Sequence, residues 1–255
     1  AAIFGHFYVC FGTIDCQGPR QLQLLSSLPN FPFPVAGLTA PPPTNPNFED
    51  IMTGGGIANP APLGLFGFGV TTVLLSFDNA GISSPKLLHL VLAHALFFGG
   101  AAQFASGMWE FKANSIFGAT AFSTFGAFWI SLAAFIWAHE GGLYAMTTEL
   151  DMTLYFLCWG VLVSLFTVIT SRISTAHLAL FGGVAIVFFL LALGEWNLTA
   201  KRVAGYLGLA CGVLALYLGY ALLLNEVWKG YYLPFGPCKP AAARYVEEET
   251  SNLKV

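Results

Sequence analysis

Hydrophobic residues are concentrated in long blocks along this chain rather than in short alternating periods. Beyond residue 58, six apolar stretches follow one another, each near the length of about 20 residues that crosses a hydrocarbon layer of about 30 Å. Short polar or Gly/Pro-rich segments separate them. The stretches cover residues 60–77, 87–108, 116–138, 152–170, 176–194 and 203–225. The pattern predicts an all-α integral membrane protein with six transmembrane helices.

Proline-rich sequence before these stretches and polar sequence after them divide the chain into three parts. Residues 1–57 are rich in proline, which continues neither a helix nor a central strand, and we expect an extended, soluble N-terminal arm. Residues 58–229 hold the six spans. Residues 230–255 turn polar and predict a solvated C-terminal tail, with a docking peptide as the alternative.

An even number of spans places both termini on the same side of the membrane. The arm, the connections at Lys112 and Arg172, and the tail together carry seven of the ten Lys and Arg residues. The excess of positive charge on cytoplasmic segments then predicts that both termini are cytoplasmic. We expect a multi-pass protein of the plasma membrane, with an organellar membrane as the alternative.

Composition agrees with a lipid environment and excludes one class of partner. Of the 255 residues, 56% are hydrophobic and only 9% are charged, whereas soluble domains have about a quarter charged residues. The formal net charge is −3, and the basic residues cluster only at the pair Lys201 and Arg202. A nucleic-acid-binding surface needs more positive charge than this, so we expect no nucleic-acid partner.

Residues that commonly carry catalysis or bind metals are scattered. The five cysteines have no metal-ligand spacing. His89 and His94 are five residues apart, which is unfavourable for one helical face, and His139 and His177 lie near span ends where water is accessible. We find no Ser/His/Asp set, zinc signature or phosphate-binding loop in the apolar region. An enzyme is therefore disfavoured, and we expect no metal and no cofactor.

The second apolar stretch carries polar residues at helical spacing. In a regular helix, Gly99, Gln103, Ser106 and Glu110 share one face. Polar groups facing hydrocarbon cost several kcal/mol, so this face should point to the protein interior or to a water-filled path. The alternative for Gln103 is a hydrogen bond between helices, and the alternative for Glu110 is an interfacial residue paired with Lys112.

The first apolar stretch opens with "ANPAPLGLFGFG" at residues 58–69. Asn59 suits an N-cap, and Pro60 suits the first helical position because proline lacks an N–H there. The amides of Ala61, Leu63 and Gly64 would then lie at the positive end of the helix dipole. We interpret this turn as a candidate carboxylate-binding mouth, with a simple helix cap as the alternative.

The third apolar stretch combines small and aromatic residues. Gly118, Ala119, Ser123 and Gly126 would let neighbouring helices approach closely. Phe125 precedes Gly126, and a large ring there narrows a passage and gates it by dewetting, although such a ring more often packs in a core.

Three segments of the chain form a recognisable set: "ANPAPLGLFGFGVTTVLLS" (58–76), "GGAAQFASGMWEFKANSIFGATAFSTFGAFWIS" (99–131) and "GYALLLNEVWKGYYLPFG" (219–236). Together they resemble the acetate uptake transporter family, which includes the bacterial succinate–acetate permeases and the fungal acetate permeases. The heptad Asn-Pro-Ala-Pro-Leu-Gly-Leu at 59–65 is the family's signature. The resemblance covers about residues 57–236 and implies a homohexamer of six-span protomers. Each protomer would move acetate, and in some members succinate or other short carboxylates, as a proton symporter or an anion channel.

The resemblance also implies roles for individual residues. Phe68 and Phe125 match the family's hydrophobic constriction, where bacterial members have Tyr in place of Phe125. The third constriction residue comes from the fifth span, where Val184 is the candidate. The full set of predicted path residues is Asn59, Leu63, Phe68, Thr71, Gln103, Glu110, Phe125 and Val184. Glu110 and Glu226 are the candidates for proton coupling.

Transport of acetate-like monocarboxylates is the function that the sequence favours. Two alternatives stay open. One is a structural or assembly subunit that contacts partner subunits through its long N-terminal arm, which the bacterial family members lack. The other is a channel for ammonium or another small solute.

Overall fold

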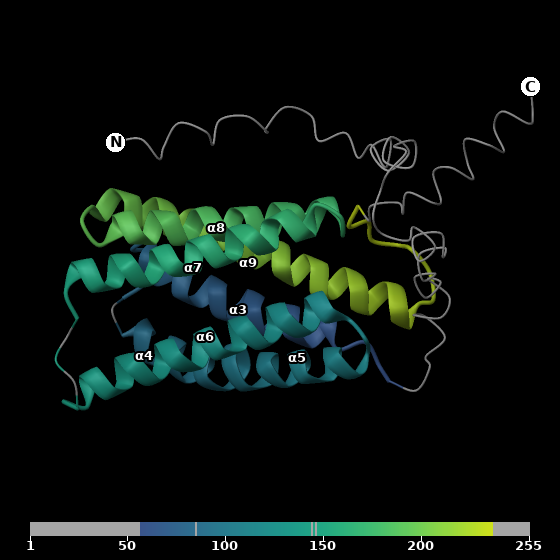
Figure 1. The fold of residues 1–255 in the computed structure, drawn as a ribbon, viewed down its shortest axis with the longest axis horizontal. Helices are drawn as coiled ribbons and strands as arrows, with labels where there is room; N and C mark the ends of the chain where they lie inside the picture. The colour runs from purple at the N-terminus through teal and green to yellow at the C-terminus, as the bar shows by residue number, and fades with distance from the viewer. Residues whose placement is uncertain (1–56, 85, 144, 146, 237–255) are drawn as a thin grey trace, which may run out of the picture. The chain divides into compact units, whose positions relative to one another are not determined.

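The computed structural model describes residues 57–84, 86–143, 145 and 147–236. These residues form six helical spans that lie side by side (Figure 1), and the prediction of six transmembrane helices is confirmed. The predicted arm lies outside the described residues except for Ile57. The bounds are α3 (Ala61–Asn79), α4 (Leu87–His94), η2 (Ala95–Ala102), α5 (Gln103–Lys112), α6 (Ile116–Glu140), α7 (Glu149–Thr170), α8 (Thr175–Gly194) and α9 (Leu198–Val227).

Capping explains why two helices begin earlier than the hydrophobic pattern predicts. At the start of α7, the Thr148 hydroxyl accepts the Asp151 N–H at 3.2 Å, and the Asp151 carboxylate accepts the Thr148 N–H at 3.0 Å. At the start of α9, the Asn197 side chain accepts the N–H of Thr199 at 2.8 Å. Both caps satisfy amides of the first turn, so polar residues before the apolar stretch join the helix.

The helices pack in an order that differs from their order in the sequence. α7 packs on α8, α8 on α9, α9 on α3, α3 on the α4–η2–α5 span, and α5 on α6. The consecutive helices α6 and α7 meet instead through aromatic side chains. The rings of Phe128 and Trp159, for example, have centroids 4.8 Å apart. The space between α6, α7 and α8 is therefore filled by rings rather than by direct backbone packing.

Glycines allow α3 to approach its two neighbours. A Cβ atom at Gly212 of α9 would lie 2.6 Å from Val73 Cγ2 and 3.0 Å from the Gly69 carbonyl oxygen. On the other side of α3, a Cβ at Gly67 would lie 2.6 Å from the Phe98 carbonyl oxygen. Real Cβ atoms do not fit such gaps. Small residues thus permit close helix packing here, as the sequence predicts.

The second span contains a π-helix that the sequence pattern does not predict. Residues Ala95–Ala102 form η2 between the α-helical segments α4 and α5. Gly99 lies in this π-helical segment and faces Thr71 of α3. The Thr71 side chain fills the space that a Cβ atom at position 99 would need. The polar residues Gln103, Ser106 and Glu110 lie in the regular α5, where all three are buried. The predicted inward orientation of these three residues is therefore confirmed.

The segment after α9 returns to the start of α8. The Asn225 side-chain oxygen accepts the N–H groups of Tyr232 at 2.8 Å and Leu233 at 3.0 Å. The Gly236 carbonyl then accepts the Thr175 N–H at 2.9 Å. Residues 230–236 therefore differ from the expected solvated tail, because hydrogen bonds hold them against α9 and α8.

Candidate functional site

Two cavities lie within the helical bundle and meet at three side chains. The first has a volume of about 180 Å³ and lies among the first half of α3, both ends of α5, the first half of α6 and the first half of α8. The second, of about 50 Å³, lies among the later parts of α3, α6 and α8 and the middle of α9. Among the described residues, only Phe68, Phe125 and Val184 line both cavities. We call these three residues the waist.

The waist is apolar and tightly held. The rings of Phe68 and Phe125 meet edge to face with centroids 5.0 Å apart, and both residues are buried with Val184. The Phe125 ring also packs against Trp159 and Phe181, at centroid distances of 6.5 Å and 6.1 Å. Edge-to-face contacts with Phe68 and Phe181 and stacking on Trp159 together hold the orientation of the Phe125 ring. A solute that passes between the cavities must cross a short segment that offers no side-chain hydrogen bond.

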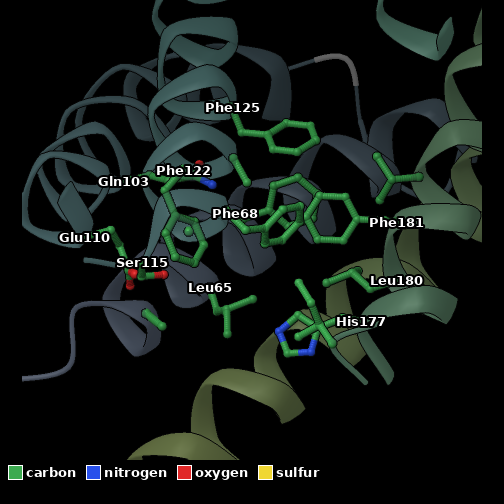
Figure 2. A pocket seen from close by; sticks show the side chains of 16 residues that line it. Leu65, Phe68, Gln103, Glu110, Ser115, Phe122, Phe125, His177, Leu180 and Phe181 are labelled. Atoms are coloured by element: carbon green, nitrogen blue, oxygen red, sulfur yellow. The ribbon is translucent and has the colours of Figure 1, made fainter. Parts of the chain in front are cut away.

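Two polar side chains of α5 have unpartnered atoms at the first cavity. Gln103 is fully buried, lines this cavity, and neither its amide oxygen nor its amide nitrogen has a hydrogen-bond partner among the described residues. The Glu110 Oε1 atom is also buried and unpartnered, while the Ser115 side chain bonds to the Glu110 carboxylate. Figure 2 shows Gln103 and Glu110 on the same wall of the cavity.

The second cavity has polar atoms of the same kind. Thr72 Oγ1 and Trp129 Nε1 are buried, line this cavity and have no partner among the described residues. A buried polar group without a hydrogen bond costs about 1–3 kcal/mol, so such groups usually face water or a ligand. Both cavities can therefore stabilise water or a polar solute, and the waist between them cannot.

The sequence places His177 only near a span end, and the structure places it in the first cavity. His177 lies in the first turn of α8, and its Nδ1 atom is 2.7 Å from the Ser174 hydroxyl oxygen. In Figure 2 its ring lies apart from Gln103 and Glu110, beside Leu180. The spacing Ser-x-x-His at a helix start was the available signal, because an N-cap serine contacts the third helical residue.

The start of α3 differs from the predicted mouth. The N-cap is Pro60, one residue later than predicted, and the Asn59 side-chain oxygen accepts the Ala61 N–H at 3.0 Å. The Gly64 N–H donates to the Pro60 carbonyl at 3.3 Å. Two of the three amides expected to bind a carboxylate are therefore occupied. The same Pro60 carbonyl also accepts a 2.7 Å hydrogen bond from Ser106, which joins α3 to α5.

Four of the predicted path or coupling residues lie away from both cavities. Leu63 is 44% exposed and lines neither cavity, and neither does Asn59. The Thr71 hydroxyl donates to the Gly67 carbonyl at 2.8 Å and packs against η2. Glu226 is half-buried near the end of α9. The structure brings the other five together, namely Phe68, Gln103, Glu110, Phe125 and Val184.

No arrangement for a metal ion occurs in the part of the chain that the structure describes, because no three His, Cys, Asp or Glu side chains gather there. The chemistry that the two cavities offer is hydrogen bonding and the exclusion of charge by the waist. Such a site is suited to a small polar solute.

Known proteins resemble this chain over the same region. The sequence profile of the GPR1/FUN34/YaaH family matches residues 44–234. The succinate-acetate/proton symporter SatP of Escherichia coli K12 is 37% identical over 182 residues, which cover 71% of this chain and 96% of that protein. Ammonia transport outward protein 2 of Saccharomyces cerevisiae is 36% identical, covering 64% of this chain and 61% of that protein. The solved structure of the bacterial acetate channel SatP superposes with a TM-score of 0.68 at 36% identity, covering 71% of this chain and 99% of that chain.

Proposed function

The chain belongs to the GPR1/FUN34/YaaH family, and we propose that it transports acetate and similar short carboxylates across a membrane. The path runs within one protomer, from the first cavity through the waist to the second cavity. One observation carries this proposal: the three side chains shared by the two cavities are the apolar residues Phe68, Phe125 and Val184. Family membership supplies the substrate class, and the cavities supply the route.

Selection in this path acts on hydration and size. A carboxylate must lose water to enter the waist, and that loss is costly because no side chain there replaces the hydrogen bonds. The methyl group of acetate fits an apolar ring, whereas a larger or doubly charged acid loses more water. The transported acids are therefore small and carry one charge, and succinate passes more slowly than acetate.

The experiment that tests this function is uptake of radiolabelled acetate by liposomes that contain the purified protein. We expect uptake that saturates with acetate concentration and exceeds that of protein-free liposomes. Folded protein that gives no uptake above protein-free liposomes would refute the proposal. Unlabelled formate, propionate, lactate and succinate added in turn as competitors define the substrate range.

Proton coupling is the second part of the proposal, because one similar protein is named a symporter and one similar structure a channel. Glu110 faces the first cavity with an unpartnered oxygen, whereas Glu226 lines neither cavity. Glu110 is therefore the proton-carrying residue. An inward proton gradient at fixed acetate-anion concentration should accelerate uptake, and Glu110→Gln should abolish this acceleration. If the proton gradient does not change the rate of acetate uptake by the wild type, the protein acts as a channel instead.

Ammonium is the second candidate substrate, because a similar yeast protein is named for ammonia transport. Competition separates the two substrates. If ammonium is carried through the same path, excess ammonium at constant pH lowers acetate uptake. If ammonium leaves acetate uptake unchanged, the carboxylate is the substrate of this path and ammonium is not.

Assembly and location extend the proposal beyond the single chain. We expect a homohexamer in the plasma membrane, with one transport path in each protomer. Exposed apolar side chains on the helices, such as Phe97, Val168 and Ile186, suit contact with lipid or with another copy. Chemical cross-linking in native membranes measures the oligomer size, and a ladder that ends at the dimer would contradict the hexamer.

A further inference from the structure

His177 offers the substrate a hydrogen-bond donor that the waist lacks. We infer that His177 is a substrate-binding residue whose Nε2–H group binds the substrate carboxylate in the first cavity. The inference rests on the proposed transport function and names the group that recognises the substrate's charge. Two independent observations carry it: the hydrogen bonds around the His177 ring, and an unpartnered amide on the opposite wall.

The Ser174 hydroxyl bonds to the Nδ1 side of the His177 ring. Ser174 is the N-cap of α8, and its oxygen accepts the backbone N–H of His177 at 3.1 Å. Its own hydrogen is then available to the His177 Nδ1 atom, 2.7 Å away. A neutral ring that accepts this hydrogen at Nδ1 carries its proton on Nε2. A charged ring is protonated at both nitrogens, so Nε2 is a donor both in that state and in this neutral tautomer.

The backbone amides of α8 cannot take this role. The Thr175 N–H donates to the Gly236 carbonyl at 2.9 Å, and the Ala176 N–H donates to the Phe235 carbonyl at 3.4 Å. Ser174 occupies the third amide, that of His177. The first turn of α8 is therefore fully bonded, while its positive end still favours an anion nearby. The donor left for a ligand in this turn is the His177 side chain.

The opposite wall of the cavity strengthens the assignment. Gln103 is 0% exposed, lines the same cavity, and keeps both amide atoms without a protein partner. Figure 2 shows Gln103 and Glu110 on the α5 side and His177 on the α8 side. A carboxylate is repelled by the nearby Glu110 when that group is ionised, so it binds at the α8 wall. The Gln103 amide remains for water or for a second polar group of a longer acid.

Substitutions of His177 test the inference in the liposome assay. Charge-assisted hydrogen bonds are stronger than neutral ones, so His177→Leu should raise the half-saturating acetate concentration by about tenfold. His177→Gln keeps an N–H donor and should stay within about threefold of the wild type. The matched control is His89→Leu. His89 is exposed on α4, 3.7 Å from Glu140, and lines neither cavity, so its loss should leave half-saturation unchanged.

A spectroscopic titration of the wild-type protein reports binding separately from transport. Wild-type protein with ¹⁵N-labelled histidine is titrated with acetate, and the His177 Nε2 resonance is identified by its absence in His177→Gln. Acetate should shift this resonance, and acetamide, which has no carboxylate, should shift it far less. Two results would overturn this inference while leaving the proposed function intact. One is a half-saturating acetate concentration in His177→Leu equal to that of a transporting wild type. The other is a His177 Nε2 resonance that does not shift when acetate is added. A wild type that transports no acetate would overturn the proposed function, and the role of His177 with it.

Discussion

Removal of the Phe125 ring tests the waist most directly. Phe125 is 4% exposed, and its ring packs against those of Phe68, Trp159, Phe166 and Phe181 at centroid distances between 5.0 Å and 6.5 Å. Truncation of a buried Phe to Ala costs about 3–5 kcal/mol of stability in soluble cores. Each aromatic pair accounts for about 0.5–1.5 kcal/mol of such a loss. We therefore expect Phe125→Ala to unfold at a lower temperature while still inserting as six helices.

The effect on transport follows from joining the two cavities. Without the ring, the volumes of about 180 Å³ and about 50 Å³ become continuous and admit water through the waist. If the energy barrier at the waist falls by about 1.4 kcal/mol more for a large acid than for acetate, the ratio of large-acid flux to acetate flux rises tenfold. We expect the lactate-to-acetate flux ratio in liposomes to rise by about that factor. An unchanged ratio in folded Phe125→Ala would refute the role of the waist.

Two phenylalanines of the same helix provide matched controls. Phe122 lines only the first cavity and Phe128 only the second. An alanine at either position removes the same ring, so Phe122→Ala and Phe128→Ala should each lose stability. Because the waist is the barrier, each should keep the lactate-to-acetate flux ratio within about twofold of the wild type. If either control changes the ratio as much as Phe125→Ala does, selection is spread along the path.

Two further substitutions separate ligand binding from packing. Gln103→Leu removes an unpartnered buried amide, so it should raise the free energy of unfolding by about 1–3 kcal/mol in thermal denaturation. It should also raise the half-saturating concentration of succinate, whose second carboxylate reaches this wall, more than that of acetate. A less stable Gln103→Leu would instead indicate a hydrogen bond between helices. Gly212→Ala should lower the melting temperature sharply, because its Cβ would lie 2.6 Å from Val73. Gly182→Ala should not, because its nearest neighbour, Thr167 Cγ2, would lie at 3.6 Å.

The six spans and the inward face of α5 followed from the sequence because they depend on local periodicity. Apolar length alone predicts a helix in lipid, where every backbone group must bond within its own segment. The spacing of Gln103, Ser106 and Glu110 predicts one buried face, since polar groups avoid hydrocarbon. The pairing of Phe68 with Phe125 came from the resemblance of the sequence motifs, and the structure places these rings in contact.

Other features depend on tertiary structure and left little trace in the sequence. The π-helical turn at Ala95–Ala102 changes backbone hydrogen bonds without changing the apolar composition. The predicted mouth at α3 was wrong in register by one residue, and the Asn59 side chain and the Pro60 carbonyl occupy two of its amides. His177 was missed because a histidine near a span end is usually interfacial. Its place in the first cavity depends on tertiary structure, which brings the first half of α8 to a space also lined by α3, α5 and α6.

The distribution of unpartnered polar atoms along the path explains why affinity and selectivity should be separable. Gln103 and Glu110 face one cavity, and Thr72 and Trp129 face the other. An anion is hydrated or hydrogen-bonded on both sides and dehydrated only between them, so the barrier lies at the waist. Substitutions in the cavities then change how strongly a carboxylate is held, whereas substitutions at the waist change which carboxylate crosses. A variant such as His177→Leu should therefore alter half-saturation with little change in the lactate-to-acetate ratio at saturation, the reverse of Phe125→Ala.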